Sequence, residues 1–337
     1  MATKKIVKAK SATKPYPFFM ISNRNQEKQG LGKDLGPTLY FESPAESDPT
    51  KMSSWTSLSA QQFVARLREL ADGFDQVPDS QNEDQQHISL FVHGYNVSWD
   101  AASKRYAQIK TTLFDASDLG VLILFTWPSN GSPAGYLPDR EDARDSAAGI
   151  VDMLVFLNEY LTARQRLAAQ EQDPNKLCRA KLSVIAHSMG NYVMQKALAV
   201  AAKRLNSPQL ITLLNQVVMV AADVDNDLFQ KDKPEDSDGS LMANLCYRIG
   251  ALYTGLDQVL GASAGLKHFG ARRLGRSGLE DRTKVWSNVF DIDVSDLVAG
   301  NENIHSAVFD SPDAMKLVEQ MLRGVDRRIL SEGKSAA

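Results

Sequence analysis

Short apolar runs alternate with longer segments of helical periodicity over most of the chain. Each run is followed by a polar or Gly-rich turn, which is typical of βαβ units that build a parallel sheet. Two further strands are predicted near the N-terminus, in the apolar run beginning at Tyr16 and at Thr38–Phe41. The pattern predicts an α/β fold with a mostly parallel central sheet and helices on both faces. The main predicted strands are Ile88–Val92, Val121–Phe125, Leu182–Ala186, Val217–Ala222, Leu245–Tyr253 and Lys284–Ile292.

Helical spacing of apolar residues marks the segments between these strands. The segment 59–74 has apolar residues on one helical face, and Ser59 with Gln62 forms a capping box at its start. The last segment opens with Ser311 followed by proline, a typical helix start. The other predicted helices lie near 100–114, 144–169, 190–205 and 311–327.

The two ends of the chain and two internal stretches depart from this regular pattern. Residues 1–15 are predicted to form a flexible basic tail and 331–337 a flexible C-terminus, which leaves 16–330 as a single domain. Stretches near 127–145 and 228–283 are predicted as cap-like insertions. Loops after parallel strands gather at the carboxyl edge of the sheet, where ligands bind, so the first insertion is expected to roof a site.

Composition and charge narrow the classes of function. Of 337 residues 43% are hydrophobic, enough for a large core, and 38 Lys and Arg against 41 Asp and Glu give a formal net charge of −3. This near-neutral charge argues against a nucleic-acid binder. No stretch reaches the roughly 18–20 apolar residues that span a bilayer, and no secretory signal is visible, so a cytoplasmic location is expected. Cys178 and Cys246 are too few and too far apart for a disulfide framework or a usual zinc site.

Residues 182–198 contain the most informative motif. An apolar strand leads into the pentapeptide AHSMG, residues 186–190, and then into a helical pattern. This order of strand, turn and helix is that of a nucleophile elbow, in which a sharp turn exposes the central serine, here Ser188. The positions two before and two after the serine must be small because backbone segments approach closely there, and Ala186 and Gly190 meet this requirement.

A second turn supplies candidate groups for stabilising a negatively charged oxygen. The strand 88–92 ends in His93-Gly94-Tyr95, a His-Gly turn where hydrolases of this architecture place one donor of an oxyanion hole. The amides of Tyr95 and of Met189, at the start of the helix after Ser188, are the candidate donors. The His93 side chain is expected mainly to brace the loop. Candidate substrate contacts are His93, Gly94, Trp127 and Tyr136.

A serine becomes nucleophilic only when a base removes its proton and a carboxylate orients that base. In this architecture the chain order is serine, acid, histidine. His305 follows a strand and precedes the final helix, which is the expected place for the base, whereas His268 lies in a basic Gly-rich stretch without a strand before it. His187 is expected to be structural, because neighbouring side chains diverge at such a turn.

The acid has three candidates. Asp257 follows the strand before the last one, the usual position, whereas Asp223 and Asp225 follow the strand one earlier, a variant position. The alternative for each of them is a helix cap or a salt bridge at the edge of the sheet.

Residues 88–322 resemble the alpha/beta-hydrolase family of bacterial proteins catalogued as a domain of unknown function, DUF900. The resemblance implies an alpha/beta-hydrolase fold and a serine-hydrolase triad, while the natural substrates of the family are poorly defined. One departure is Ala222-Asp223, where the family often has Pro-Asp. The matching motifs are His93–Val97, Phe125–Ser129, Tyr136 with Asp139, Ala143 and Ser146, Ile185–Asn191, Ala222–Asp225 and His305-Ser306.

These observations predict a carboxylesterase or lipase-like enzyme that acts on a small acyl substrate without cofactor or metal. Thioester hydrolysis and acyl transfer use the same constellation and stay open as alternatives. A non-catalytic interaction module that keeps the fold is a further alternative. The sequence does not indicate the oligomeric state.

Overall fold

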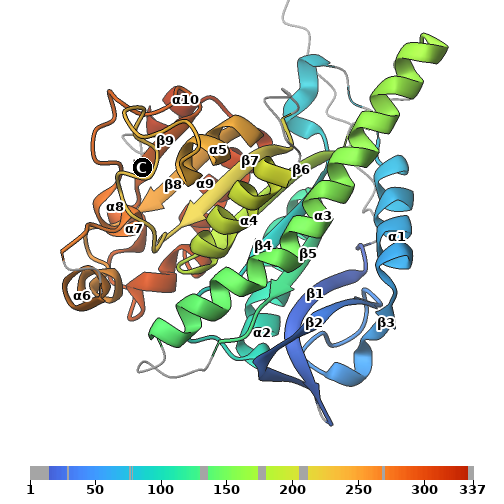
Figure 1. Cartoon of the computed structure of the whole chain (residues 1–337), viewed down its shortest axis with the longest axis horizontal. Helices are drawn as coiled ribbons and strands as arrows, with labels where there is room; N and C mark the ends of the chain where they lie inside the picture. The colour runs from blue at the N-terminus through green and yellow to red at the C-terminus, as the bar shows by residue number, and fades with distance from the viewer. Residues whose placement is uncertain are drawn as a thin grey trace, which may run out of the picture.

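The structure is a computed structural model that describes residues 15–332, apart from 29, 76, 78, 130–135, 174–179, 205–211 and 268–269. One sheet of nine strands organises the chain, in the order β3-β2-β1-β5-β4-β6-β7-β8-β9 (Figure 1). In this order, every pair of neighbouring strands from β1 to β9 is parallel, whereas β2 is antiparallel to both of its neighbours, β1 and β3. The strands are β1 (Phe18–Glu27), β2 (Gly30–Ser43), β3 (Thr56–Leu58), β4 (His87–Val92), β5 (Gly120–Thr126), β6 (Lys181–His187), β7 (Leu214–Val220), β8 (Cys246–Tyr253) and β9 (Val289–Asp293).

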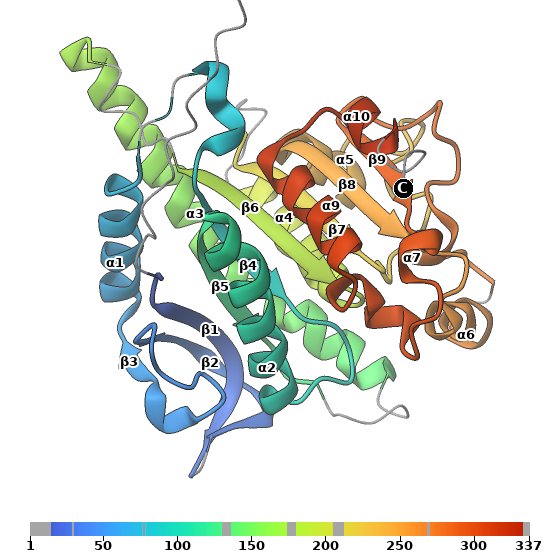
Figure 2. The same ribbon diagram turned by 180° about the vertical axis from the view of Figure 1, so that it is seen from behind.

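Helices cover both faces of the sheet, as the sequence pattern predicts. One face carries α1 (Ala60–Asp72), α3 (Tyr136–Glu171), α4 (Gly190–Arg204) and α5 (Asp238–Leu245) (Figure 1). The opposite face carries α2 (Trp99–Ile109) and α9 (Pro312–Arg323) (Figure 2). Four further helices lie on the side of β8 and β9: α6 (Gln258–Lys267), α7 (Leu274–Ser277), α8 (Ser295–Val298) and α10 (Arg327–Glu332).

The central strands are buried along almost their whole length because both faces of the sheet are covered. Every residue of β4 and β5 is buried, including the polar His87 and Ser89, and β6 is buried from its second residue onward. Strands buried on both faces have continuous apolar runs rather than alternation. The runs read from the sequence therefore locate the centre of the sheet well.

The structure confirms one predicted helix start and corrects one predicted helix end. At α1 the Ser59 hydroxyl accepts from the Gln62 amide and the Gln62 side chain accepts from the Ser59 amide, which completes the capping box. The helix predicted to end at residue 327 stops earlier, because Gly324 adopts a left-handed conformation with φ 84° and ends α9 at Arg323.

Helix α3 begins earlier than predicted. The sequence pattern assigns residues 136–145 to an insertion, but they form the first turns of a helix that continues to Glu171. Pro138 is tolerated there because the first turn has no partner for its missing N–H, and Asp139 favours the helix N-terminus electrostatically. The preceding residues 130–135 of the predicted insertion lie outside the described residues.

The other predicted irregular stretches also contain regular structure. The range 228–283 includes α5 and strand β8, which pairs with β7 and β9, so this range is not one insertion above the sheet. Strand β9 begins at Val289 rather than at Lys284. The predicted tail lies outside the described residues, apart from Pro15. At the other end, residues 331–332 complete α10 and the remainder of the predicted flexible C-terminus lies outside the described residues.

Strand β2 is much longer than the predicted Thr38–Phe41, because it pairs with β1 over most of its length although most of its own residues lie outside the core. Backbone hydrogen bonds form this part of the hairpin without the apolar alternation on which a sequence prediction depends.

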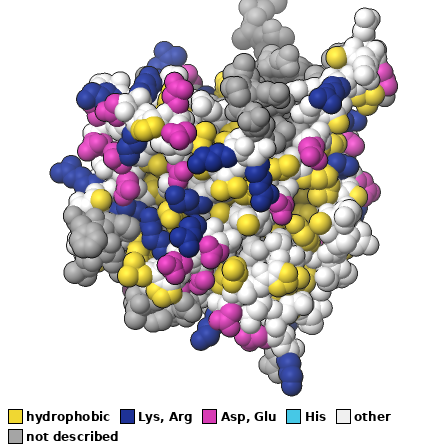
Figure 3. Space-filling model, in the orientation of Figure 1, with side chains coloured by type: hydrophobic (Ala, Val, Ile, Leu, Met, Phe, Trp, Pro, Cys, Tyr) yellow, Lys and Arg dark blue, Asp and Glu magenta, His cyan; other side chains and the backbone are white. Residues whose placement is uncertain are grey.

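Figure 3 shows Lys, Arg, Asp and Glu side chains interspersed on one face of the molecule, with hydrophobic side chains between them. Within the described ranges, no helix combines the length and apolar composition needed to cross a membrane. Cys246 is buried and carries a free thiol, whereas Cys178 lies outside the described residues.

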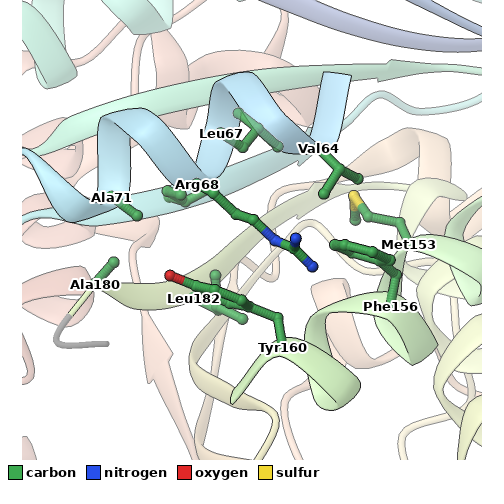
Figure 4. A pocket seen from close by; sticks show the side chains of 10 residues that line it. Val64, Leu67, Arg68, Ala71, Met153, Phe156, Tyr160, Ala180 and Leu182 are labelled. Carbon is green, nitrogen blue, oxygen red and sulfur yellow. The ribbon is translucent and has the colours of Figure 1, made fainter. Parts of the chain in front are cut away.

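An apolar pocket lies between α1 and α3 (Figure 4). The Arg68 guanidinium sits 4.5 Å from the ring centre of Phe156 and 4.8 Å from that of Tyr160. The pocket reaches Leu182, near the amino end of β6, whereas Ser188 follows the carboxyl end of the same strand. The pocket is thus separated from the candidate active site by the length of the strand.

Candidate active site

Ser188 occupies a strained turn between β6 and α4. Its φ is 53°, in the left-handed region that non-glycine residues seldom adopt and that costs about 1–3 kcal/mol. Surrounding hydrogen bonds hold the turn: the Ser188 amide donates to the Val220 carbonyl at 3.0 Å, and the Ser188 carbonyl accepts from the Asn191 amide at 3.1 Å. At Gly190 a Cβ would lie 2.5 Å from the His93 carbonyl oxygen, so this close approach needs glycine.

Three side chains from distant parts of the chain meet at the carboxyl edge of the sheet. Ser188 Oγ lies 2.8 Å from His305 Nε2, and His305 Nδ1 lies 2.7 Å from Asp257 Oδ2. Ser188 follows β6, Asp257 follows β8, and His305 lies in a short 3₁₀ segment, 304–309, after β9. The geometry is that of a serine whose hydroxyl proton can pass to a histidine oriented by a carboxylate.

The Asp257 carboxylate is fully buried, and each of its oxygens has a partner. Oδ2 faces His305, while Oδ1 accepts from the Leu260 amide at 3.0 Å in the first turn of α6. The Arg276 guanidinium donates to the Asp257 carbonyl oxygen. These contacts hold the carboxylate in one orientation, and the amide at the helix N-terminus favours its negative charge.

The two alternative acids lie elsewhere in the site. Asp223 Oδ1 accepts from Arg273 Nε at 2.8 Å and Oδ2 accepts from the Tyr136 hydroxyl at 2.7 Å. Asp225 also pairs with the Arg273 guanidinium. The structure therefore brings Asp257, and neither of the other two carboxylates, to His305.

His187 contacts the backbone of His305. Its Nε2 donates to the His305 carbonyl oxygen at 2.9 Å, because a carbonyl can only accept. Burial lowers the pKa of His187 to about 3, so the ring is neutral near neutral pH. This position agrees with the structural role expected for His187.

The His93 ring fixes the turn that follows β4. The Trp127 amide donates to Nε2 at 3.2 Å, so the proton of the neutral ring is on Nδ1, which donates to the Gly94 carbonyl at 2.8 Å. Burial holds the pKa of His93 well below its usual range, which keeps the ring neutral.

The Gly94–Tyr95 peptide is oriented by this bond. In a planar trans peptide the carbonyl and the following N–H point in opposite directions. Since the Gly94 carbonyl faces His93, the Tyr95 N–H points to the other side. A Cβ on Gly94 would lie only 2.7 Å from Ser188 Cβ, so glycine allows the turn to approach the serine.

Three of the expected substrate contacts are buried side chains. His93 and Trp127 are 2% and 0% exposed and stack on each other with ring centres 5.3 Å apart. Tyr136 is 3% exposed, and its hydroxyl is bonded to Asp223. Core packing and internal hydrogen bonds occupy these side chains in the structure, and their contact with substrate stays a prediction. For His93 the bracing role expected alongside is the one observed.

Two arginines of the site were not identified from the sequence. Arg273 is fully buried between Asp223 and Asp225, and Arg276 contacts the Asp257 backbone. A basic Gly-rich stretch normally indicates a solvated loop, and only burial distinguishes these residues from surface charge. His268, in the same stretch, lies outside the described residues. Among the side chains that the structure describes, no group of three or more His, Cys, Asp or Glu is arranged to hold a metal ion.

Comparison with known proteins agrees with this architecture. A family described as alpha/beta hydrolase of unknown function (DUF900) matches residues 75–324, well over half of the chain. An uncharacterized protein of Nostoc sp. is 25% identical over 131 residues, a match that covers 32% of this chain and 30% of the relative. The aligned part therefore spans less than a third of that relative.

Solved structures of hydrolases are also similar to this chain, at low sequence identity. Lipase B of Aspergillus fumigatus is 12% identical, with a TM-score of 0.39, over 92% of this chain and 67% of that one. The esterase of Pyrobaculum calidifontis is 11% identical, with a TM-score of 0.35, over 71% and 76% of the two chains. The phospholipase PlaB of Legionella pneumophila is 14% identical, with a TM-score of 0.36, over 73% and 60%.

Proposed function

Because this chain belongs to the DUF900 family of alpha/beta hydrolases, we propose that it is a serine hydrolase that cleaves carboxylic esters through Ser188, His305 and Asp257. The observation that carries the proposal is the continuous pair of hydrogen bonds from the Ser188 hydroxyl through the His305 ring to the Asp257 carboxylate. Such a chain activates an otherwise weak nucleophile.

Acylation begins with proton transfer from the serine. His305 Nδ1–H donates to Asp257, so the Nε2 lone pair is free to accept the Ser188 hydroxyl proton. Ser188 Oγ forms a bond to the ester carbonyl carbon, and the carbonyl oxygen takes up the negative charge. As the tetrahedral intermediate collapses, the bond to the leaving alcohol breaks and the Nε2 proton passes to that alcohol.

Deacylation repeats these steps with water. His305 takes a proton from water while the hydroxide oxygen attacks the acyl carbon. The bond to Ser188 Oγ then breaks, and the serine regains its proton from Nε2. Asp257 stays ionised throughout and stabilises the imidazolium that forms in both halves.

The amides of Tyr95 and Met189 are proposed as the oxyanion donors. The orientation of the Gly94–Tyr95 peptide supports the first, because its N–H points away from His93. The place of Met189 directly before α4 supports the second, since free amides gather at helix N-termini. The acyl substrate is small and uncharged in this proposal, and no cofactor enters the steps.

Labelling with a fluorophosphonate probe tests the proposal. We expect the native protein to be labelled at one site and Ser188→Ala to remain unlabelled, because the probe reacts with an activated serine. Mass spectrometry of the labelled peptide identifies the site, and circular dichroism verifies that the variant is folded. A folded native protein that stays unlabelled and inactive would favour the alternative of a non-catalytic interaction module.

We propose ester hydrolysis rather than thioester hydrolysis or acyl transfer because it is the simplest reaction of the triad. A chromogenic ester series of increasing acyl length, run beside matched thioesters, defines the substrate. The same assay with added alcohols as acceptors measures acyl transfer. Faster turnover of the thioesters, or transfer exceeding hydrolysis, would replace the ester assignment while keeping the triad.

Two substitutions of His93 test the orientation of the Tyr95 amide. An asparagine amide reaches approximately the position of Nδ1 and keeps a donor for the Gly94 carbonyl, whereas a glutamine amide reaches approximately that of Nε2. Loss of one oxyanion donor typically lowers kcat by about 10²–10³-fold. We therefore expect a loss of roughly 100-fold for His93→Gln and a clearly smaller loss for His93→Asn. Equal losses in two folded variants would contradict this role of the ring.

A further inference from the structure

Arg24 is a buried cation in the N-terminal hairpin, which the proposed mechanism does not use. The side chain is 1% exposed and lies in β1. The pairing of β1 with β2 shifts register on both sides of this residue, between Ser22 and Arg24 and again between Arg24 and Gln26. Such irregularities reorient side chains and are enriched beside active sites.

The Arg24 guanidinium donates to three neutral oxygens from three parts of the chain. Nε donates to Thr126 Oγ1 at 2.8 Å, Nη2 to the Val97 carbonyl at 2.7 Å, and Nη1 to the Gly32 carbonyl at 3.1 Å. Burial lowers the pKa of Arg24 to about 10, an effect that the charge of Asp139 opposes, so the side chain stays a cation at neutral pH. A buried charge is costly, and its polar partners must offset that cost.

Two of these hydrogen bonds position the loop 93–97, which follows β4. Thr126 Oγ1 accepts from Arg24, so its hydroxyl proton is available to His93 Nε2 at 3.1 Å. At the other end of the loop Arg24 binds the Val97 carbonyl directly. Arg24 therefore fixes both ends of the segment that carries the Tyr95 amide.

A second contact holds Val97 from the other side. Its amide donates to Ser129 Oγ at 3.3 Å, and the Ser129 hydroxyl donates to Asp139 at 2.6 Å. Ser129 and Asp139 are both buried. Hydrogen bonds therefore hold the loop on both sides, and the bond from Arg24 connects it to the N-terminal hairpin.

We propose that Arg24 is a positioning residue of the active site: its guanidinium joins the hairpin to the loop 93–97 and holds the Tyr95 amide in place for the oxyanion. The inference rests on the proposed function. Arg24 touches neither substrate nor reacting atoms and acts through His93 and Val97. The hairpin, which lies at the edge of the sheet, thereby becomes part of the catalytic apparatus.

The expected effect falls on the transition state rather than on substrate binding. A displaced amide weakens stabilisation of the oxyanion, whereas the uncharged ester carbonyl of the ground state depends on it less. Arg24→Met is expected to lower kcat about 10–100-fold while KM changes less than about 3-fold. Arg24→Lys keeps the buried charge but has no planar fork, so a smaller decrease of about 3–10-fold is expected.

Kinetics with a chromogenic ester and inhibition by a trifluoromethyl ketone test this proposal. The ketone forms a tetrahedral adduct with an oxyanion on Ser188, so its Ki should rise in parallel with the fall in kcat/KM. Arg66→Met is the matched control, since Arg66 is a partly exposed arginine that pairs with Glu42 of β2. It is expected to leave kcat and Ki unchanged. If Arg24→Met does not fold, Arg24→Lys alone decides the question.

Folded Arg24 variants with native kcat and Ki would overturn the inference, as would variants whose unfolding temperature alone decreases. If the native protein turns over esters and is labelled at Ser188, these results refute only the role of Arg24. A native protein without Ser188-dependent turnover refutes the proposed function and this inference together.

Discussion

The substitution Asp257→Asn is expected to lower kcat of ester hydrolysis by about four orders of magnitude with little change in fold. The carboxylate oxygen that faces His305 Nδ1 at 2.7 Å only accepts hydrogen bonds. An asparagine that presents its NH₂ group there forces Nδ1 to accept, which moves the ring proton to Nε2. His305 then has no lone pair for the Ser188 hydroxyl, and the serine stays protonated.

Initial rates on a chromogenic ester measure this effect, and Asp225→Asn is the matched control. Asp225 has a 53% exposed side chain and pairs with Arg273 rather than with His305, so its substitution is expected to change kcat less than about 3-fold. Asp223→Asn should likewise retain the triad, and its activity is therefore compared per folded molecule. Native activity in Asp257→Asn, or a loss of four orders in folded Asp223→Asn, would remove Asp257 as the acid.

The substitution Asp223→Ala is expected to destabilise the protein by about 3–5 kcal/mol. The ion pair between Asp223 and Arg273 is 3% and 0% exposed on its two sides. Removing the carboxylate leaves a guanidinium that is shielded from water and has lost its buried charge partner, while its other partner, Asp225, is 53% exposed. The Tyr136 and Ser263 hydroxyls lose an acceptor at the same time.

Urea unfolding followed by tryptophan fluorescence measures the change in stability. The surface pair of Arg204 and Asp152 provides the control, because its side chains are 51% and 68% exposed. For Asp152→Ala we expect a change below about 1 kcal/mol. An Asp223→Ala protein that unfolds at the same urea concentration as the native protein would contradict this prediction. Water or a rearranged side chain would then compensate the charge of the buried arginine.

Local sequence patterns were sufficient for the strand and turn around Ser188. The continuous apolar run before it and the helical period after it reflect burial on both faces of β6 and one-sided burial of α4. Gly190 is fixed by contact with backbone atoms, a requirement that a motif expresses directly. The start of α3 was missed because Pro138 and the polar residues after it resemble a loop unless the helix N-terminus is recognised.

Buried charges were the features that the sequence did not predict. In the sequence, nothing distinguishes Arg24 and Arg273 from arginines on the surface. Both are nevertheless buried and hydrogen-bonded to several oxygens. Their partners lie far away in the chain, for example the 102 residues that separate Arg24 from Thr126. No local pattern encodes such a pairing, because it depends on which strands become neighbours.

The sequence by itself determined the α/β class, the strands of the sheet centre and the candidate serine and histidine, because burial periodicity and turn chemistry are local properties. It left three carboxylates as possible partners of His305. Only the tertiary structure decided among their positions, by placing the loop after β8 against the segment after β9 and by pairing Asp223 and Asp225 with Arg273 instead. The physical reason is that hydrogen bonding and ion pairing act over a few ångströms, and the distances between these groups exist only once the strands have assembled.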